Sequence, residues 1–332
     1  MPTYCKKLLS FLAIFCLSLG LVCSFDQPLA EASQKSTKKS QPTTKKVSSK
    51  KRSGKKSASP KKRKTAAKKA PPVVIGNNYK GAVLYNADTQ ELLFQRRDNA
   101  PVPPASLTKI MSMFVALDAI ASEKANLASL VLISPKAATT GGSSMGIQAG
   151  ELVPLNELLK GMAICSGNDA SVAVAEFIGG SEESFVILMN EKARQLGMNN
   201  TTFKNAHGLH IPGQQTTAFD MLILARNYLE KYPENLSIYH SSTRYTYKGK
   251  TSRNANTLLG TYEGVNGLKT GYVAASGYNL ITTAEHDGTK FINVLLGAPT
   301  SKIREQEVAF LLSQHLPGFA KEAEDKRVVA HQ

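Results

Sequence analysis

Cysteine is scarce in this chain of 332 residues, which contains only four. Cys5, Cys16 and Cys23 lie close to the N-terminus, and Cys165 stands alone in the rest of the sequence. If the N-terminal segment is removed, no intramolecular disulfide can form, so the fold must depend on its apolar core. We interpret Cys165 as a small core residue, because free cysteine is among the most buried residue types.

A long hydrophobic run is also missing near the N-terminus. The apolar stretch at residues 8–22 is short for a membrane-spanning helix, which needs about 20 apolar residues. Two lysines precede it, and Ala30-Glu31-Ala32 then offers the small residues of a cleavage site. We therefore expect residues 1–32 to be a signal peptide that exports the chain to the periplasm or cell envelope. An uncleaved N-terminal anchor is the alternative.

Acidic residues are absent from residues 33–70, where 16 Lys and Arg residues stand. Residues 71–332 carry 23 basic and 23 acidic residues, so the net charge of +16 belongs to this one segment. A domain that binds duplex DNA normally has a basic face of its own. We therefore expect no nucleic-acid partner, although a nucleic-acid-binding protein with a basic tail stays open as an alternative of another class.

Large apolar residues are nearly absent from the same segment, in which Val47 is the single large aliphatic side chain. Such a composition cannot bury enough apolar surface to offset chain entropy. We expect residues 33–72 to form a disordered polybasic linker that ends at Pro71-Pro72. Its like charges favour binding to anionic envelope polymers, and a merely solvated spacer is the alternative.

The sequence beyond the linker mixes strand and helix patterns, and we expect one domain at residues 73–318 and a C-terminal tail at 319–332. Alternating residues predict a hairpin over 82–86 and 92–96, and further strands near 262–269, 277–284 and 290–296. Apolar periodicity predicts helices from about 106, and over 155–164, 169–178, 182–196, 218–231 and 303–316. This order predicts an α+β fold, in which an antiparallel β-sheet is flanked by helices and joined to a helical subdomain.

Three short motifs contain groups suited to nucleophilic catalysis: Ser106-Leu107-Thr108-Lys109, Ser166-Gly167-Asn168 and Lys269-Thr270-Gly271. The first motif is weak by itself, because Ser-x-x-Lys also occurs four times in the basic segment. Only the copy at 106 opens an amphipathic helix. There Lys109 lies on the same helix face as Ser106, and the unpaired N–H groups of the helix N-terminus favour developing negative charge.

These residue types fit together chemically. A serine hydroxyl needs a base, and Lys109 can be that base only if burial or a second cation, such as Lys269, lowers its pKa. Ser166 adds a hydroxyl for proton relay, and Asn168 adds an amide for holding a substrate. We expect Gly271 to let a substrate backbone lie against its strand.

With the three motifs in this order, the chain resembles the low-molecular-mass penicillin-binding proteins. These are the D-alanyl-D-alanine carboxypeptidases of the serine β-lactamase and transpeptidase superfamily. The resemblance covers about residues 78–312, and its matching stretches are 104–111, 143–151, 165–176, 205–217 and 265–280. It implies a β-lactamase/transpeptidase-like fold with residues 73–318 as the DD-peptidase catalytic domain. It also implies a peptidoglycan pentapeptide substrate, inhibition by β-lactams, and neither cofactor nor metal.

The resemblance implies a role for each residue of the first two motifs. Ser106 is the nucleophile that becomes acylated, and Lys109 is its general base. Ser166 relays the proton to the leaving amine, and Asn168 orients the substrate.

The resemblance also implies how the substrate is bound. Lys269 and Thr270 lie near its terminal carboxylate, beside Gly271. The backbone N–H groups of Ser106 and Tyr272 form the oxyanion hole. Arg304 aligns with the family's carboxylate-binding arginine, and a surface arginine on the last helix is the alternative.

Other activities remain as alternatives. A DD-endopeptidase that cleaves peptidoglycan cross-links would use the same motif residues. A class A β-lactamase needs an additional Glu, and Glu-x-x-Asn occurs only at 123–126 and 263–266, which are misplaced relative to Ser166. A non-enzymatic cell-wall-binding module would not need Ser106 and Lys109 together. We interpret His207 and His210 as part of a loop beside the site, since no third metal ligand has a suitable spacing.

Overall fold

The computed structural model describes residues 76–316. The predicted signal peptide, the basic linker and the C-terminal tail at 319–332 lie outside the described residues and stay predictions. Within 76–316, no helix combines the length and the apolar character needed to cross a membrane.

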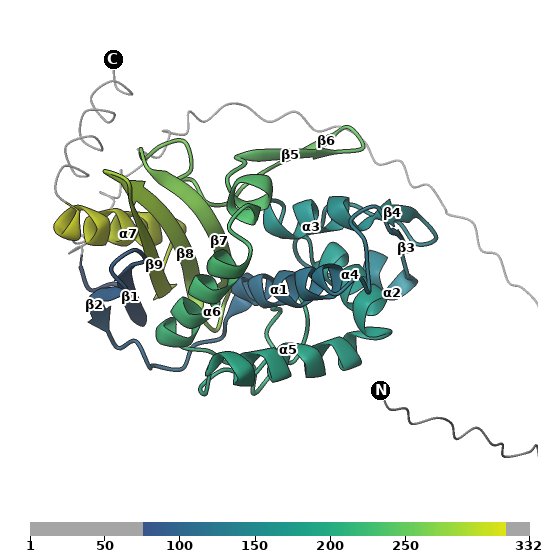
Figure 1. Ribbon diagram of the computed structural model, residues 1–332, viewed down its shortest axis with the longest axis horizontal. Helices are drawn as coiled ribbons and strands as arrows, with labels where there is room; N and C mark the ends of the chain where they lie inside the picture. The colour runs from purple at the N-terminus through teal and green to yellow at the C-terminus, as the bar shows by residue number, and fades with distance from the viewer. Residues whose placement is uncertain (1–75, 317–332) are drawn as a thin grey trace, which may run out of the picture. The chain divides into compact units, whose positions relative to one another are not determined.

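A five-stranded antiparallel sheet is built from both ends of the described chain, in the order β2-β1-β9-β8-β7. Figure 1 shows the two N-terminal strands next to the C-terminal ones. The strands are β1 Gly81–Asn86, β2 Glu91–Arg96, β7 Val265–Val273, β8 Gly277–His286 and β9 Thr289–Ala298. β7 therefore forms an outer edge of this sheet, which is the edge that carries the third motif.

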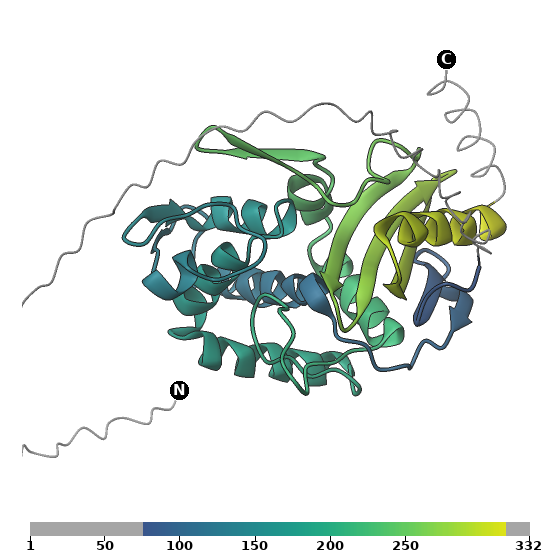
Figure 2. The same cartoon turned by 180° about the vertical axis from the view of Figure 1, so that it is seen from behind.

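The two faces of the sheet are buried against different helices. Side chains alternate between faces along a strand, so Val83 and Tyr85 of β1 pack in the core beneath α6 Ala218–Lys231. Ala82 and Leu84 pack on the opposite side, in the core beneath α7 Ser301–His315. The two views agree, with α6 in front of the sheet in Figure 1 and α7 in front in Figure 2.

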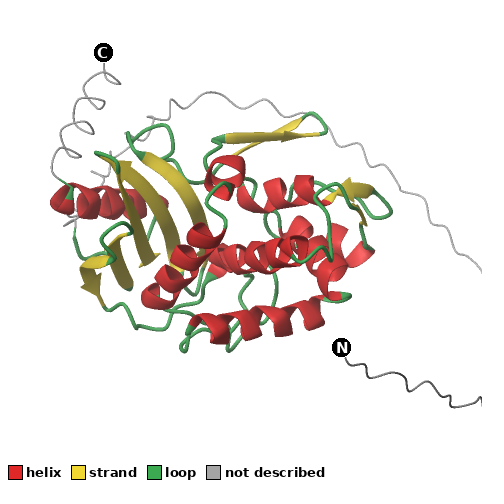
Figure 3. Ribbon diagram, in the orientation of Figure 1, coloured by secondary structure: helices red, strands yellow, loops and turns green. Residues whose placement is uncertain are grey.

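A helical subdomain adjoins the sheet, as Figure 3 shows. Its central helix is α1 Thr108–Ala121, which contacts α3 Leu155–Ala163, α4 Asn168–Gly179, α5 Glu182–Leu196 and α6. Eleven residues of α1 are buried, so this helix is covered on nearly all sides and not only along the predicted stripe. A helix that is apolar on most of its circumference is expected to lie inside a protein.

The predicted α+β class, the hairpin and the long helices are confirmed. Thr217 caps α6, because its hydroxyl accepts a hydrogen bond from the Asp220 N–H at 3.1 Å. Two boundaries were wrong. The strand predicted near 262–269 runs from Val265 to Val273, so the Lys-Thr-Gly motif lies inside it. The helix predicted from Ser106 begins at Thr108, after the 3₁₀ turn η1 Ala105–Leu107.

Short elements were not predicted, because they are too brief or too exposed to show a hydrophobic period. They are α2 Pro135–Ala138, the pairs β3 Leu130–Leu132 with β4 Leu152–Pro154 and β5 Arg244–Tyr247 with β6 Lys250–Arg253, and the π-helical turn η2 Leu236–His240.

Candidate active site

The three motifs meet where the sheet edge contacts the helical subdomain. Ser106 lies in η1, which packs against β7. Lys109 lies in the first turn of α1, and its Nζ is 3.0 Å from Ser106 Oγ and 2.7 Å from Asn168 Oδ1 at the start of α4. Lys269 Nζ of β7 lies 3.0 Å from Ser166 Oγ. The structure therefore brings together the residues that the sequence singled out.

Lys109 has the environment that a lysine base requires. Its side chain has no exposed surface, and its third polar neighbour is the His207 carbonyl, at 2.6 Å. Burial and then the nearby charge of Lys269 hold the pKa of Lys109 well below its usual range, while Asp169 acts in the opposite direction. In its neutral form, the amine can accept the proton of the Ser106 hydroxyl across the 3.0 Å contact.

Lys269 is the second buried cation of the site. It is 3% exposed, and it donates hydrogen bonds to Ser166 Oγ and to the Thr270 carbonyl at 3.1 Å. Burial, and then the charge of Arg304, lower the pKa of Lys269 to about 7. The group therefore changes charge near neutral pH.

Arg304 is buried and not a surface residue, so the alternative interpretation was wrong. It is 3% exposed on α7 and donates from Nη2 to the Ala255 carbonyl at 3.2 Å and to Glu305 Oε1 at 2.8 Å. After burial, its charge is the second cause of the lowered pKa of Lys269. Its Nε has no hydrogen-bond partner among the described residues. Arg304 is thus placed to add positive charge beside Lys269.

Gly271 lies against a part of the protein that the sequence analysis did not predict as its neighbour. A Cβ atom at this position would lie 3.1 Å from the Ser106 nitrogen and 3.2 Å from the Pro104 oxygen. The missing side chain therefore lets β7 lie directly against the turn that carries Ser106, and the expected contact of Gly271 with a substrate backbone stays a prediction. Sequence reasoning placed the glycine correctly but could not identify its neighbour, which comes from more than 160 positions away.

Two non-glycine residues of the site have left-handed backbone conformations. Ala105, directly before Ser106, has φ +50°, and Ser166 has φ +57°. Side chains with a Cβ rarely adopt this region, and each instance costs on the order of 1–2 kcal/mol. The surrounding contacts hold the backbone in these conformations directly before Ser106 and at Ser166 itself.

Thr270 and Tyr272 continue the third motif along the edge strand. Thr270 is 6% exposed, whereas Tyr272 is 54% exposed, and its ring packs on Tyr278 with 4.3 Å between centroids. Because Gly271 contacts the Ser106 turn, Tyr272 follows directly after the point of closest approach. This placement is compatible with the predicted oxyanion hole, which stays a prediction.

Asp169 is a site residue that the sequence analysis missed. It has no exposed surface, and its carboxylate accepts hydrogen bonds from Ser144 Oγ at 2.6 Å, Met145 N at 3.1 Å and Gly146 N at 3.0 Å. It therefore fixes the loop whose Ser143 carbonyl accepts a hydrogen bond from the Asn168 N–H, at 2.7 Å. Its position directly after Ser-Gly-Asn was the available signal.

His207 and Cys165 are among the remaining residues that the sequence analysis discussed. His207 lies in a loop beside the site, with its Nδ1 accepting a hydrogen bond from the Leu209 N–H at 3.1 Å. Residues 76–316 contain no cluster of three or more His, Cys, Asp or Glu side chains that could hold a metal ion. Cys165 packs against the core but is only half-buried, and burial raises the pKa of its thiol. A raised pKa disfavours the thiolate and so argues against a nucleophilic role.

A cavity of about 620 Å³ lies elsewhere, between α6 and the far ends of β8 and β9. Its walls include Tyr85, Arg226, Thr283 and Ile292, and no residue of the three motifs. The candidate active site is therefore assigned by its chemistry and not by the size of a cavity.

The comparisons with known proteins agree with this chemistry. The D-alanyl-D-alanine carboxypeptidase family, peptidase S11, matches residues 65–300. D-alanyl-D-alanine carboxypeptidase DacF of Bacillus subtilis is 40% identical over 249 residues, which are 72% of this chain and 62% of that protein. D-alanyl-D-alanine carboxypeptidase DacC of Escherichia coli is 39% identical over 70% of this chain and 59% of its own length. The chain thus spans about three-fifths of the length of these curated relatives.

Solved structures give the same result. Penicillin-binding protein 5 from Haemophilus influenzae has a TM-score of 0.69 and 34% identity, and the match covers 75% of this chain and 72% of that one. Penicillin-binding protein D2 from Listeria monocytogenes, in its cefotaxime-bound form, has a TM-score of 0.66 and 28% identity, and covers 73% of this chain and 98% of that one.

Proposed function

The chain belongs to the D-alanyl-D-alanine carboxypeptidase family, and we propose that it removes the terminal D-alanine from peptidoglycan stem pentapeptides. The reaction passes through an acyl-enzyme on Ser106. The observation that supports this most strongly is the buried Lys109, whose Nζ lies 3.0 Å from Ser106 Oγ and whose pKa is held well below its usual range. A lowered pKa increases the fraction of the lysine that is neutral and can act as a base.

The first step forms the bond between Ser106 Oγ and the carbonyl carbon of the penultimate D-alanine. The hydroxyl proton passes to the amine of Lys109, and the carbonyl oxygen becomes an oxyanion. The backbone N–H groups of Ser106 and Tyr272 would stabilise that charge, as preorganised donors do in acyl transfer. Asn168, held by the Gly141 carbonyl through its Nδ2 at 2.7 Å, would orient the substrate amide.

The second step breaks the bond to the terminal D-alanine. The leaving nitrogen takes up a proton, which reaches it through the Ser166 hydroxyl from the ammonium of Lys109. Lys269 donates to Ser166 Oγ and so keeps this hydroxyl in place. Water then hydrolyses the ester and regenerates Ser106.

Recognition of the free terminal carboxylate is assigned to Lys269, Thr270 and Arg304. Lys269 and Arg304 are both buried, and the charge of Arg304 lowers the pKa of Lys269. Arg304 is already paired with Glu305 at 2.8 Å, whereas Lys269 has no ion pair among the described residues, so an incoming carboxylate would compensate its charge. Hydrogen bonds to charged groups are worth about 1.5–3 kcal/mol, so this contact can select a substrate with a free carboxyl terminus.

A β-lactam would acylate the same serine and leave a slowly hydrolysed adduct. Peptide mapping of the penicillin-labelled protein tests this, and we expect the label on Ser106. A label on another serine, or no label, would contradict the proposal.

We further propose that the chain is exported to the cell envelope and that residues 33–70 bind anionic envelope polymers there. The support is the sequence alone, which places 16 basic residues and no acidic residue in this segment. Such a run attracts anionic polymers, and salt screens the attraction. Sedimentation with purified envelopes at low salt should capture the full chain and not a variant that lacks residues 33–70. Equal sedimentation of both would contradict this role.

A further inference from the structure

The loop at residues 205–209 contacts both halves of the proposed catalytic pair. The His207 carbonyl accepts a hydrogen bond from Lys109 Nζ at 2.6 Å. Gly208 has φ +92°, and a Cβ there would lie 1.9 Å from the Ala105 oxygen, in the turn that carries Ser106. The position of this loop therefore sets where Lys109 and Ser106 stand relative to each other.

Hydrogen bonds within the loop fix its shape. Asn205 Oδ1 accepts from the Gly208 N–H at 2.6 Å, and Asn205 Nδ2 donates to the Leu209 carbonyl at 2.8 Å. The Leu209 N–H donates to His207 Nδ1 at 3.1 Å. Because Nδ1 accepts this bond, the proton of the neutral imidazole is on Nε2. These hydrogen bonds hold the loop internally, and contacts from outside residues 205–209 fix its position. Ser112 Oγ of α1 donates to the Ala206 carbonyl at 2.6 Å, and Gln214 Nε2 donates to the Leu209 carbonyl at 3.0 Å.

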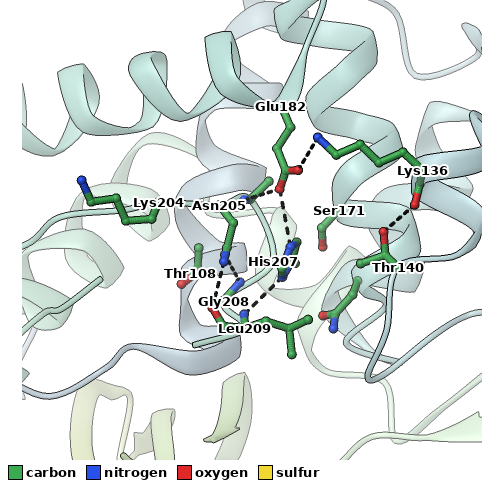
Figure 4. Close-up of polar contacts among 12 residues, drawn as sticks. Thr108, Lys136, Thr140, Ser171, Glu182, Lys204, Asn205, His207, Gly208 and Leu209 are labelled. Atoms are coloured by element: carbon green, nitrogen blue, oxygen red, sulfur yellow. Dashed lines mark hydrogen bonds and ion pairs between the residues drawn. The ribbon is translucent and has the colours of Figure 1, made fainter. Parts of the chain in front are cut away.

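Glu182, the first residue of α5, supplies an acidic contact to the loop. Figure 4 shows its carboxylate between Lys136 and His207. Its Oε1 accepts a hydrogen bond from the Ala206 N–H at 3.1 Å and lies 3.5 Å from His207 Nε2. Its Oε2 lies 3.0 Å from Lys136 Nζ. Glu182 is only 8% exposed, so these contacts are largely shielded from water.

We propose that Glu182 is a positioning residue for the Ser106–Lys109 pair, acting through Ala206 and the His207 carbonyl. The inference rests on the proposed function of Lys109 as the base. Among the described residues, Glu182 forms no hydrogen bond with Ser106 or with Lys109. The proposed effect on the reaction passes through the loop.

The adjacent Glu183 provides a matched control. It carries the same charge, belongs to the same first turn of α5, and also binds Lys136, at 3.1 Å. Its side chain is 77% exposed. It forms no hydrogen bond with residues 205–209 in the described structure. A comparison of the two glutamates therefore separates the loop contact from charge near the N-terminus of α5.

The test measures the acylation rate with a fluorescent penicillin, normalised to folded protein by saturation labelling. Glu182→Ala leaves the Ala206 N–H buried without its acceptor, and we expect at least an about tenfold loss in rate. Glu182→Gln keeps an oxygen at the same reach, so its rate should stay within about threefold of wild type. Glu183→Ala should acylate like wild type.

A fourth variant keeps the test valid if Glu182→Ala fails to fold. Glu182→Asp retains the charge but is one methylene shorter, so its oxygen cannot reach the Ala206 N–H as the native one does. The proposal requires Glu182→Gln to be faster than Glu182→Asp. A purely electrostatic role requires the reverse, and that outcome would overturn the proposal.

The pH profile supplies a readout that a merely structural role would not change. The charged groups around Lys109 are Lys269 and Asp169, with Glu182 and Lys136 beyond His207. The base must be neutral, so the rate falls as the pH drops below its pKa. Loss of the Glu182 contact admits water to Lys109 and raises its pKa, which moves the acid limb of Glu182→Ala to higher pH. Removal of a negative charge alone would move it to lower pH.

The outcomes distinguish this inference from the proposed function. If wild type is labelled at Ser106 while Glu182→Ala matches Glu183→Ala in both rate and acid limb, the positioning role is refuted and the proposed function stands. If wild type is not labelled at Ser106, the proposed function itself fails.

Discussion

Lys269 Nζ and Ser166 Oγ lie 3.0 Å apart although 103 positions separate the two residues in the sequence. The contact joins the edge strand of the sheet to the link between α3 and α4 in the helical subdomain. The site is therefore complete only when both parts of the domain are folded against each other. Substitutions at this junction should therefore reduce catalysis more readily than they disturb the packing of either hydrophobic core.

The exchange of Lys109 for arginine tests the base directly. Lys109→Arg keeps the positive charge, but a guanidinium does not deprotonate in proteins. General base catalysis contributes typically about 10²- to 10⁴-fold, so we expect acylation by penicillin to fall by at least 10²-fold. Labelling kinetics measure this, with circular dichroism as the check on folding. Normal labelling of a folded variant would refute the role of Lys109.

The low pKa of Lys269 predicts a specific pH dependence of substrate binding. The lysine is charged below its pKa of about 7 and loses its charge as the pH rises through that value. KM for a peptide that ends in free D-Ala-D-Ala should therefore increase above about pH 7. A peptide with an amidated terminus should show no such increase, because it presents no carboxylate to Lys269. Equal pH profiles of KM for the two peptides would contradict this assignment.

Removal of Arg304 should weaken recognition of the terminal carboxylate. We expect Arg304→Ala to lose at least about tenfold in kcat/KM for a free D-Ala-D-Ala terminus. The loss for the amidated peptide should be much smaller. Assays of both enzymes on both peptides form a double-mutant-style cycle that isolates the contact. If both peptides lose activity equally, Arg304 has a structural role only.

Arg304→Ala should also change the pKa of Lys269. The charge of Arg304 is one cause of the lowered pKa of Lys269, so Arg304→Ala should shift the rise in KM to higher pH. An unchanged pH profile would mean that burial alone sets the pKa of Lys269.

The contact between β7 and the Ser106 turn can be tested at Gly271. In Gly271→Ala, the new Cβ would lie 3.1 Å from the Ser106 nitrogen and 3.2 Å from the Pro104 oxygen, and both are backbone atoms that cannot rotate away. Overpacking of this kind costs typically about 1–3 kcal/mol. We expect a loss of that size in the free energy of unfolding, and slower acylation because the strand and the turn move apart. Chemical denaturation and labelling kinetics measure the two effects.

Gly208→Ala should be more damaging, because its Cβ would lie 1.9 Å from the Ala105 oxygen and its φ of +92° is strained for alanine. If Gly271→Ala lowers the free energy of unfolding and the acylation rate more than Gly208→Ala does, this account of how the turn is held is contradicted.

The sequence allowed the pairing of Ser106 with Lys109 and the long elements to be predicted, because each depends on residue type and local spacing. Ser106 and Lys109 are three positions apart, and α1, α4, α5 and α6 have clear apolar periods. The positions of Lys269 and Arg304 near the site came from the resemblance. Their burial, and the effect of the charge of Arg304 on the pKa of Lys269, became evident only in the fold.

The parts that escaped prediction depend on backbone groups or on distant neighbours. The His207 carbonyl binds Lys109, and every residue type has a carbonyl, so its side chain gives no signal. Glu182 resembles Glu183 in sequence, yet only one of the two reaches the 205–209 loop. The reason for Gly271 depends on a turn at the other end of the chain, which no local pattern reveals.

The most direct test of the proposed function is mass analysis of muropeptides after incubation with the purified protein. The substrates should include pentapeptide monomers and cross-linked dimers, and Ser106→Ala should serve as the inactive control. We predict that wild type converts pentapeptides to tetrapeptides with release of D-alanine, while the cross-links stay intact and Ser106→Ala is inactive. Cleavage of dimers with pentapeptides left unchanged, or equal activity of Ser106→Ala, would contradict the proposal.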